Sequence, residues 1–368
     1  MTQTTTRVYH VNPLAPEPAA IAAAAAVIRA GRLVAFPTET VYGLGANARD
    51  PEAIARIFAA KERPFADPLI VHLAAAADLP GACAEVTPLA WTLAAAFWPG
   101  PLTLVLPRGE QIAANVAGGR ATVAVRVPAH PVAHALLLAS GVPIAAPSAN
   151  RFSRPSPTSA QHVLEDLDGR IDLLLDGGAT TIGLESTVVD LTSDPPRLLR
   201  PGGVAAEELL AHIPELHVPA APTVAKLEEG LVAPGTLLRH YSPRAQVLLV
   251  RGDGERYRTL AQAGVALAAA CGRRVGLLLT DDDLPGCAGL SAIQVSLGAG
   301  DAPAALAHNL FAALRSLDAT GVDIILAREI DPAGLGRAIG DRLFRAANGV
   351  VIENLDELHV QIDRGFGG

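Results

Sequence analysis

The stretch "RDPEAIARIFAAKERPFADPLIVHL" (residues 49–73) holds signals for a helix, a loop and a strand in direct succession. Asp50 stands where a helix cap is expected, and Pro51 follows in the first turn. Lys61 lies at the end of this helix and Arg63 follows in the loop, and the apolar run that ends in His72 is typical of a buried strand. The stretch therefore predicts a helix, a cationic loop and a buried strand.

The same alternation extends over the first 200 residues. Strands are predicted at "LVAF", "LTLVLP", "TVAVRVP", "VPIAAP", "IDLLLD", "STVVDLT" and "PRLLR", with capped helices between several of them. The run "GLGANA" nominally fits a dinucleotide-binding loop, but it does not open a helix directly after a strand, so we discount it. This pattern predicts an α/β fold with a mixed sheet.

Residues 213–244 differ from the rest, because prolines recur and no hydrophobic period holds. The segment reads as a linker, and it is longer than usual connections, so we expect it to be ordered against another part of the protein. A second strand and helix alternation follows and predicts a small Rossmann-like unit. The expected domains are 1–212, an ordered linker over 213–244, and 245–368.

Composition narrows the class of protein. The 368 residues carry a formal net charge of −8 and only 4% aromatic residues, which argues against bulk binding of nucleic acid or anionic membranes. Cys83, Cys271 and Cys287 form no CxxC pair, which suits a reducing compartment. The apolar stretch Ala19–Ile28 is too short to span a membrane. We expect a cytoplasmic protein without a membrane segment.

Several cations have two interpretations. Lys61 either complements the C-terminal end of its helix or, with Arg63, binds phosphate oxygens. Arg126 lies in a hydrophobic strand, where either a buried acid or a ligand carboxylate or phosphate must satisfy it. His72 taken alone is more often a hydrogen-bonded core histidine than a catalyst. Arg200, at a strand end, adds a further anion-binding group where α/β folds place their sites.

The stretch "APSANRFSRPSPTS" (146–159) gathers hydroxyl and amide side chains between a strand and a helix. A helix cap explains Ser156 or Thr158, but it explains Ser148 and Asn150 less well. Such groups are good donors to phosphate oxygens. The sequence contains no Walker A motif, no GxSxG elbow and no second ligand at metal spacing near His72, so covalent catalysis and a protein-held metal are not favoured.

Taken together, these motifs resemble one family. The stretches "FPTETVYGLG", "KERPFADPLIVH", "FWPGPLTLVL", "VAVRVP", "PSAN", "STVVD" and "LLRPG" occur in this order over about 190 residues. They resemble the YrdC-type domain of threonylcarbamoyl-AMP synthases, and "HYSP" with the C-terminal unit resembles the long, two-domain members. The resemblance implies a twisted mixed sheet domain with a concave cleft, then a linker and a small Rossmann-like C-terminal domain.

The resemblance also implies an activity. Members are L-threonylcarbamoyladenylate synthases, a kind of nucleotidyltransferase, and make threonylcarbamoyl-AMP and pyrophosphate from L-threonine, bicarbonate and ATP, with Mg²⁺ accompanying the ATP. The product goes to a threonylcarbamoyl transferase that modifies ANN-reading tRNAs. Whether the chain contacts tRNA directly is left open.

The site residues implied by the resemblance fall into two groups. Thr40, His72, Arg126, Ala146 and Ser186 would line the threonine site. Lys61, Arg63, Asp67, Thr122, Ser148, Asn150, Ser156, Arg200 and Tyr241 would contact ATP, with Lys61 and Arg63 acting in catalysis. Asp67 departs from the family, which commonly has Asn there, and a carboxylate beside phosphates needs Mg²⁺ or an arginine to compensate it.

Three further hypotheses remain at this point. The linker near Tyr241 could lie across the cleft and gate it, which deletion of residues 230–245 would test. The chain could be another carbamoyl-transfer enzyme with a YrdC-type domain, although the zinc-binding cysteine pairs of the hydrogenase-maturation type are missing. It could also be an RNA-binding module, against which the negative charge and sparse aromatic residues weigh.

Overall fold

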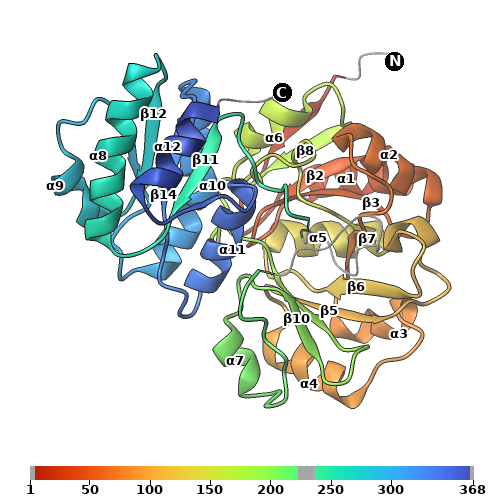
Figure 1. The fold of residues 1–368 in the computed structure, drawn as a ribbon. Helices are drawn as coiled ribbons and strands as arrows, with labels where there is room; N and C mark the ends of the chain where they lie inside the picture. Colours follow the sequence, from red (N-terminus) through yellow and green to blue (C-terminus); the bar gives the residue numbers. More distant parts are fainter. Residues whose placement is uncertain (1–4, 223–234, 236, 365–368) are drawn as a thin grey trace. The chain divides into compact units, whose positions relative to one another are not determined.

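A computed structural model describes residues 5–222, 235 and 237–364 of the chain (Figure 1). The chain divides into two compact units. The first contains residues 1–152 and 156–237, and the second contains Ser153–Pro155 and Leu238–Gly368. Residues 223–234 and 236 of the predicted linker lie outside the described residues. The linker and the domain boundaries at 212 and 245 stay predictions.

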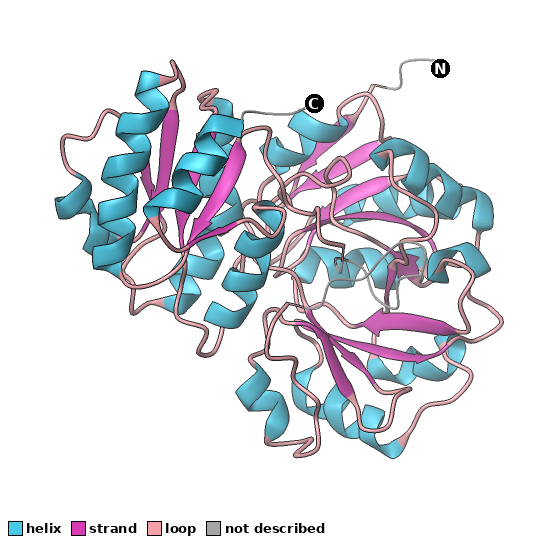
Figure 2. Ribbon diagram, viewed as in Figure 1, coloured by secondary structure: helices cyan, strands magenta, loops and turns pink. Residues whose placement is uncertain are grey.

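The first unit is built on a ten-stranded mixed sheet with the strand order β1-β8-β2-β3-β7-β4-β6-β5-β9-β10 (Figure 2). Its strands are β1 (Arg7–His10), β2 (Val34–Pro37), β3 (Tyr42–Asn47), β4 (Ile70–His72), β5 (Leu102–Pro107), β6 (Thr122–Arg126), β7 (Ile144–Ala145), β8 (Leu173–Asp176), β9 (Thr187–Asp190) and β10 (Arg197–Arg200). The sheet contains both parallel and antiparallel strand pairs, which confirms the predicted mixed α/β fold.

Helices cover this sheet. They are α1 (Pro18–Arg29), α2 (Pro51–Lys61), α3 (Leu79–Ala82), α4 (Pro88–Phe97), α5 (Pro131–Ser140), α6 (Ala160–Leu167) and α7 (Ala206–Leu210), with short 3₁₀ turns η1 (Ala76–Asp78) and η2 (Ala114–Ala117). Successive side chains of β2 enter different hydrophobic clusters: Val34 and Phe36 pack with α1 and α5, whereas Ala35 packs with α2. Because side chains alternate along a strand, both faces of the sheet are buried at β2.

The opening stretch of the sequence folds as predicted. The Asp50 side chain accepts hydrogen bonds from the backbone N–H groups of Glu52 and Ala53 at 2.9 and 3.2 Å, which caps α2. Such a cap stabilises a helix by about 1 kcal/mol. The helix ends at Lys61, where Glu62 adopts a left-handed conformation with φ 57°. The apolar run then forms β4, fully buried between β7 and β6.

The stretch "GLGANA" forms part of β3, a strand antiparallel to β2, rather than a phosphate loop. Its glycines serve close packing, because a Cβ at Gly45 would lie 2.7 Å from the Phe36 ring and 2.8 Å from Ile144. The sequence did not predict β3 or β1. Both lack a clear signal, since β1 is a mostly exposed strand and β3 follows a polar turn with little to mark its start.

The second unit has a five-stranded, all-parallel sheet with the order β13-β12-β14-β11-β15. Its elements are β11 (Gln246–Val250), α8 (Gly254–Ala270), β12 (Val275–Leu279), η4 (Asp281–Asp283), α9 (Leu284–Cys287), β13 (Ile293–Ser296), α10 (Pro303–Ala319), β14 (Ile324–Arg328), α11 (Gly336–Ala346), β15 (Val351–Ile352) and α12 (Leu355–Arg364). Helix α8 packs against α12, and α10 packs against α11 (Figure 1). This confirms the predicted Rossmann-like unit.

Candidate active site

Two residues of the predicted threonine site stand side by side at strand ends. His72 ends β4 and Arg126 ends β6, and the parallel register pairs them directly. The guanidinium of Arg126 donates from Nη1 to Thr40 Oγ1 and from Nε to the carbonyl oxygen of Gly100, both at 3.0 Å. The structure thus brings Thr40, His72 and Arg126 together.

Arg126 also has an acidic neighbour that the sequence did not single out. Its Nη2 lies 2.6 Å from Oε1 of Glu39, and both side chains are buried. A buried acid therefore partners Arg126. The guanidinium carries five N–H groups, and Nη2 and both Glu39 oxygens make no well-formed hydrogen bond within the described residues. Donors and acceptors are therefore left for a ligand.

His72 contributes a neutral imidazole to this place. Burial, and secondarily the positive charge of Arg126, lowers the pKa of His72 to about 3. Its ring meets the edge of the Phe36 ring at a centroid distance of 6.3 Å. The Nδ1 atom has no hydrogen-bond partner among the described residues, although His72 is only 4% exposed. A buried polar atom without a partner is a place where a ligand is expected.

Ser186 and Arg200 form a second part of the site. Ser186 Oγ lies 2.8 Å from Thr103 Oγ1. Nη2 of Arg200 donates to the backbone oxygen of Ser186 at 2.8 Å and to its Oγ at 3.2 Å. One predicted threonine-site residue and one predicted ATP-site residue are thus in direct contact. Ala146 is buried just after β7, and its backbone N–H donates to the carbonyl oxygen of Ile70.

Lys61 is buried and fixes the loop that follows β7. Its Nζ donates to the backbone oxygens of Ser148 and Asn150, both at 2.6 Å, and its side chain is only 1% exposed. Burial, and secondarily the charge of Arg63, lowers its pKa well below the ordinary range. An ammonium has three N–H groups, so one remains beyond these two contacts.

Arg63 and Asp67 form a buried ion pair in the loop between α2 and β4. Arg63 Nη2 lies 2.9 Å from Asp67 Oδ1 and donates to the carbonyl oxygen of Pro68 at 2.9 Å. Burial raises the pKa of the Asp67 carboxyl, and the positive charges of Arg63, Lys61 and Arg200 oppose this rise. An arginine therefore compensates the carboxylate, and the nearby charge of Arg200 indicates that these cations share one region.

The remaining predicted ATP contacts are distributed around this region. Ser156 Oγ donates to Glu185 Oε1 at 2.5 Å, and Asn150 Nδ2 donates to the carbonyl oxygen of Arg151 at 2.7 Å. Thr122 begins β6, so it lies at the opposite end of that strand from Arg126, roughly 13 Å away. The structure therefore does not place Thr122 beside the Arg126 group.

Tyr241 belongs to the second unit, where it is fully buried. Its ring lies 5.3 Å from the Phe311 ring, and the guanidinium of Arg342 lies 5.1 Å from its centroid. The predicted contact of Tyr241 with ATP stays a prediction. So does the gating hypothesis, and residues 230–234 and 236 of that segment lie outside the described residues.

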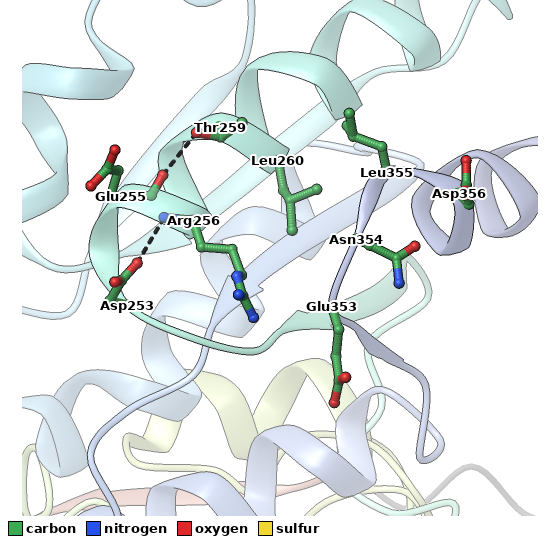
Figure 3. Close-up of a pocket in the computed structure, with 9 residues that line it drawn as sticks. All are labelled: Asp253, Glu255, Arg256, Thr259, Leu260, Glu353, Asn354, Leu355 and Asp356. Atoms are coloured by element: carbon green, nitrogen blue, oxygen red, sulfur yellow. Dashed lines mark hydrogen bonds between the residues drawn. The ribbon is translucent and has the colours of Figure 1, made fainter.

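A hollow of about 670 Å³ lies in the second unit (Figure 3), beside the segments that follow β11 and β15. It contains none of the predicted site residues. Its charged lining consists of one guanidinium, that of Arg256, and the carboxylates of Asp253, Glu255, Glu353 and Asp356. Asp253 already caps the N-terminus of α8 by accepting from the N–H of Arg256 at 2.9 Å. This hollow therefore disfavours a phosphate, even though Rossmann-like folds bind nucleotides at such strand ends.

Within the described part of the chain, no helix has the length and hydropathy that a membrane crossing requires. In the same residues, no three His, Cys, Asp or Glu side chains converge in a way that could hold a metal ion.

Sequence reasoning missed Glu39, Thr103 and Glu185, which contact Arg126, Ser186 and Ser156. Glu39 stands next to Thr40 in "FPTET", so a search for the partner of the buried Arg126 could have found it. Thr103 and Glu185 carry no signal beyond their neighbours, because their contacts depend on strand pairings far apart in sequence.

Comparison with known proteins shows which family the chain belongs to. A family model described as "Telomere recombination", the Sua5, YciO and YrdC family, matches residues 26–202. A second model, described as the C-terminal domain of threonylcarbamoyl-AMP synthase, matches residues 204–348.

Individual relatives match nearly the whole chain. A threonylcarbamoyl-AMP synthase of Pyrococcus abyssi is 47% identical over 90% of this chain and 94% of its own length. The one of Bacillus subtilis is 45% identical over 90% of this chain and 94% of its own length. The crystal structure of Pyrococcus abyssi Sua5 with L-threonine superimposes with a TM-score of 0.89 at 45% identity, over 95% of this chain and all of the other.

Proposed function

The chain belongs to the threonylcarbamoyl-AMP synthase family, and we propose that it joins L-threonine, bicarbonate and ATP into threonylcarbamoyl-AMP and pyrophosphate. Because the reaction moves an adenylyl group, the chain acts as a nucleotidyltransferase. The product serves the modification of ANN-reading tRNAs through a transferase that receives it. We place this chemistry in the cytoplasm, in keeping with three free cysteines.

One observation carries the proposal. Buried polar atoms that make no well-formed hydrogen bond among the described residues gather at two places in the first unit, although Glu39 pairs with Arg126 and Arg63 with Asp67. The first place holds Glu39, His72 and Arg126, and the second holds Arg63 and Asp67. Buried polar groups are nearly always satisfied, so such groupings mark positions where substrate atoms complete the bonding.

The first place suits an amino acid. The guanidinium of Arg126 suits a carboxylate, because it has N–H groups beyond its bonds to Thr40 and Gly100 and because a guanidinium can bind a carboxylate with two parallel bonds. The carboxylate of Glu39 suits the ammonium group, and Nδ1 of the neutral His72 offers one further polar contact. Opposite charges at fixed positions would orient threonine by both of its charged ends.

The second place suits the triphosphate of ATP. Arg63 and Arg200 bring positive charge to one region and Lys61 adds a buried amino group, and pre-placed groups of this kind stabilise a developing phosphate charge effectively. Mg²⁺ would arrive bound to ATP, since it is usually held by substrate phosphates with few protein ligands. Asp67 moderates the positive charge through its ion pair with Arg63.

The chemistry follows in two steps. The ammonium group of threonine first loses a proton to solvent; the resulting uncharged amine attacks the carbon of bicarbonate, water leaves, and a carbamate forms. A carbamate oxygen then attacks the α-phosphorus in line, a new P–O bond forms, and the bond to the β-phosphate breaks to release pyrophosphate. The protein contributes mainly orientation and charge neutralisation.

Pyrophosphate release from ATP, measured with threonine and bicarbonate each present or omitted, tests the proposal. We expect release only when both are present, together with a product whose mass is that of threonylcarbamoyl-AMP. Release that does not depend on threonine would contradict it.

The two alternatives predict other results. A carbamoyl-transfer enzyme would require a carbamoyl donor in place of threonine. An RNA-binding module would retain tRNA on a filter in the absence of substrates, whereas the net charge of −8 favours weak retention.

A further inference from the structure

The loop from residue 146 to 159 belongs to both units. Phe152 and Ser156 are part of the first unit, but Ser153–Pro155 between them are part of the second. The loop carries Ser148, Asn150 and Ser156, which we propose to contact ATP. Three residues in the middle of the loop proposed to bind ATP, Ser153–Pro155, therefore belong to the second unit.

Each residue of the tripeptide Ser153–Pro155 makes a polar contact within the second unit. The carbonyl oxygen of Ser153 accepts from the N–H of Ser242 at 2.7 Å. The carbonyl oxygen of Pro155 accepts from Nη2 of Arg315 at 2.6 Å. Nη2 of Arg154 lies 3.4 Å from Oδ2 of Asp318.

Arg315 and Asp318 lie three residues apart on α10, so they occupy one face of that helix. Both are buried, with 5% and 4% exposure. Oδ1 of Asp318 also accepts from the backbone N–H groups of Arg244 and Ala245 at 2.7 and 3.1 Å. Arg315 and Asp318 thus fix the loop and the segment entering β11 at the same place.

The loop conformation at this point needs external support. Ser153 has φ 66°, a left-handed conformation that costs a non-glycine residue energy. On its N-terminal side, the N–H of Phe152 donates to the carbonyl oxygen of Lys61, whose Nζ holds Asn150. On its C-terminal side, Ser156 binds Glu185. The tripeptide is therefore continuous with the residues proposed to meet ATP.

We propose that Arg315 and Asp318 are positioning residues for ATP: by holding Ser153–Pro155, they set the conformation in which Ser148, Asn150 and Ser156 bind the nucleotide. The inference rests on the proposed ATP role of this loop. It gives the second unit a part in the reaction although its own hollow disfavours phosphate. Simple packing would not require a buried guanidinium that donates to the Pro155 carbonyl oxygen.

The test uses the full chain with Arg315→Met, which keeps the aliphatic stem but loses the donor. Arg315→Lys keeps a donor, and Asp318→Asn keeps acceptors for the two backbone N–H groups but loses the charge facing Arg154. The control is Arg251→Met, which removes an ion pair with Glu353 in the same unit at 48% exposure. Each variant is assayed for the KM of ATP, the KM of threonine, kcat and hydrogen exchange over residues 148–158.

We expect Arg315→Met to raise the KM of ATP about tenfold, with little change in the KM of threonine, because one buried charge-assisted bond is lost. Hydrogen exchange over 148–158 should become faster. In Arg315→Lys, the KM of ATP and the exchange rate should both return part of the way to the wild-type values. Asp318→Asn should change both in the same direction but by less, and Arg251→Met should match the wild type.

Exchange and a KM of ATP that both stay at wild-type values in Arg315→Met would overturn the inference. If Arg315→Met does not fold, the same two readouts in Arg315→Lys and Asp318→Asn decide. If the wild type makes no threonylcarbamoyl-AMP, the proposed function fails, and exchange over the loop still decides whether α10 holds it. The two failures are therefore distinguishable.

Discussion

Oε1 of Glu39, in the turn between β2 and β3, lies 2.6 Å from Nη2 of Arg126 at the end of β6, and the two side chains form a buried ion pair. The pair accounts for an arginine inside a hydrophobic strand. It also leaves both Glu39 oxygens and Nη2 without well-formed hydrogen bonds within the described residues. A ligand with one positive and one negative group would complete this pair.

Glu39→Gln should raise the KM of threonine about tenfold or more and leave the KM of ATP nearly unchanged. The amide keeps the size of the side chain but loses the charge for the ammonium group, and it leaves Arg126 without its acidic partner. Steady-state kinetics with each substrate varied provides the measurement, with Glu110→Gln at an exposed position as the control. Equal changes in both KM values would count against a separate threonine site.

Lys61→Met should lower kcat about a hundredfold or more, because the buried amino group proposed to bind the phosphates is lost. It should also speed hydrogen exchange around Ser148 and Asn150, since both carbonyl contacts disappear. The control is Arg56→Met, at an exposed position of the same helix. Normal turnover in Lys61→Met would show that Lys61 has only a structural role.

Asp67→Asn should increase thermal stability at neutral pH. Burial raises the pKa of the Asp67 carboxyl above its ordinary 3.8, so the folded state binds the proton more readily than the unfolded state. Stability is then lost as pH rises from about 3.8 through the raised pKa, and an amide avoids this loss. Melting temperatures of the two proteins should converge at acidic pH and separate above it. A variant that is less stable at every pH would show that the Arg63 pair outweighs the burial.

His72→Gln should flatten the fall in stability at acidic pH. The pKa of His72 is lowered from 6.5 to about 3, so the unfolded state binds its proton first as the pH decreases. His72 therefore supplies stability above pH 6.5 that is lost between about 6.5 and 3. Melting curves from pH 4 to 8 provide the measurement. Between pH 4 and 8, the pH profile of kcat should show no titration of His72. A titration that is present in the wild type and absent in His72→Gln would contradict a neutral imidazole.

Much of the fold follows from local signals. The cap at Asp50, the apolar run of β4 and the alternation in the second unit each predict the element that forms. The strand β3 was missed because its glycines suggest a loop, whereas they admit the Phe36 ring between paired strands. Close packing of this kind depends on residues distant in sequence and leaves no local pattern.

The site was predictable as a set of residues but not as a geometry. The motif around Lys61 indicates a cation near phosphates, but nothing in it indicates that Nζ holds two carbonyls of a loop 87 and 89 residues away. Likewise, the sequence shows that Arg126 needs a partner without showing that Glu39 supplies it. These contacts are decided by which strand ends the sheet brings together.

The acidic hollow of the second unit has a consequence for stoichiometry. A Rossmann-like sheet offers a second location where a nucleotide could bind unproductively, and in this chain four carboxylates and an already capped helix end occupy that location. Calorimetric titration should therefore count a single equivalent of ATP per chain. Because this hollow does not hold nucleotide, ATP bound by the chain would be ATP that threonine can meet in the first unit.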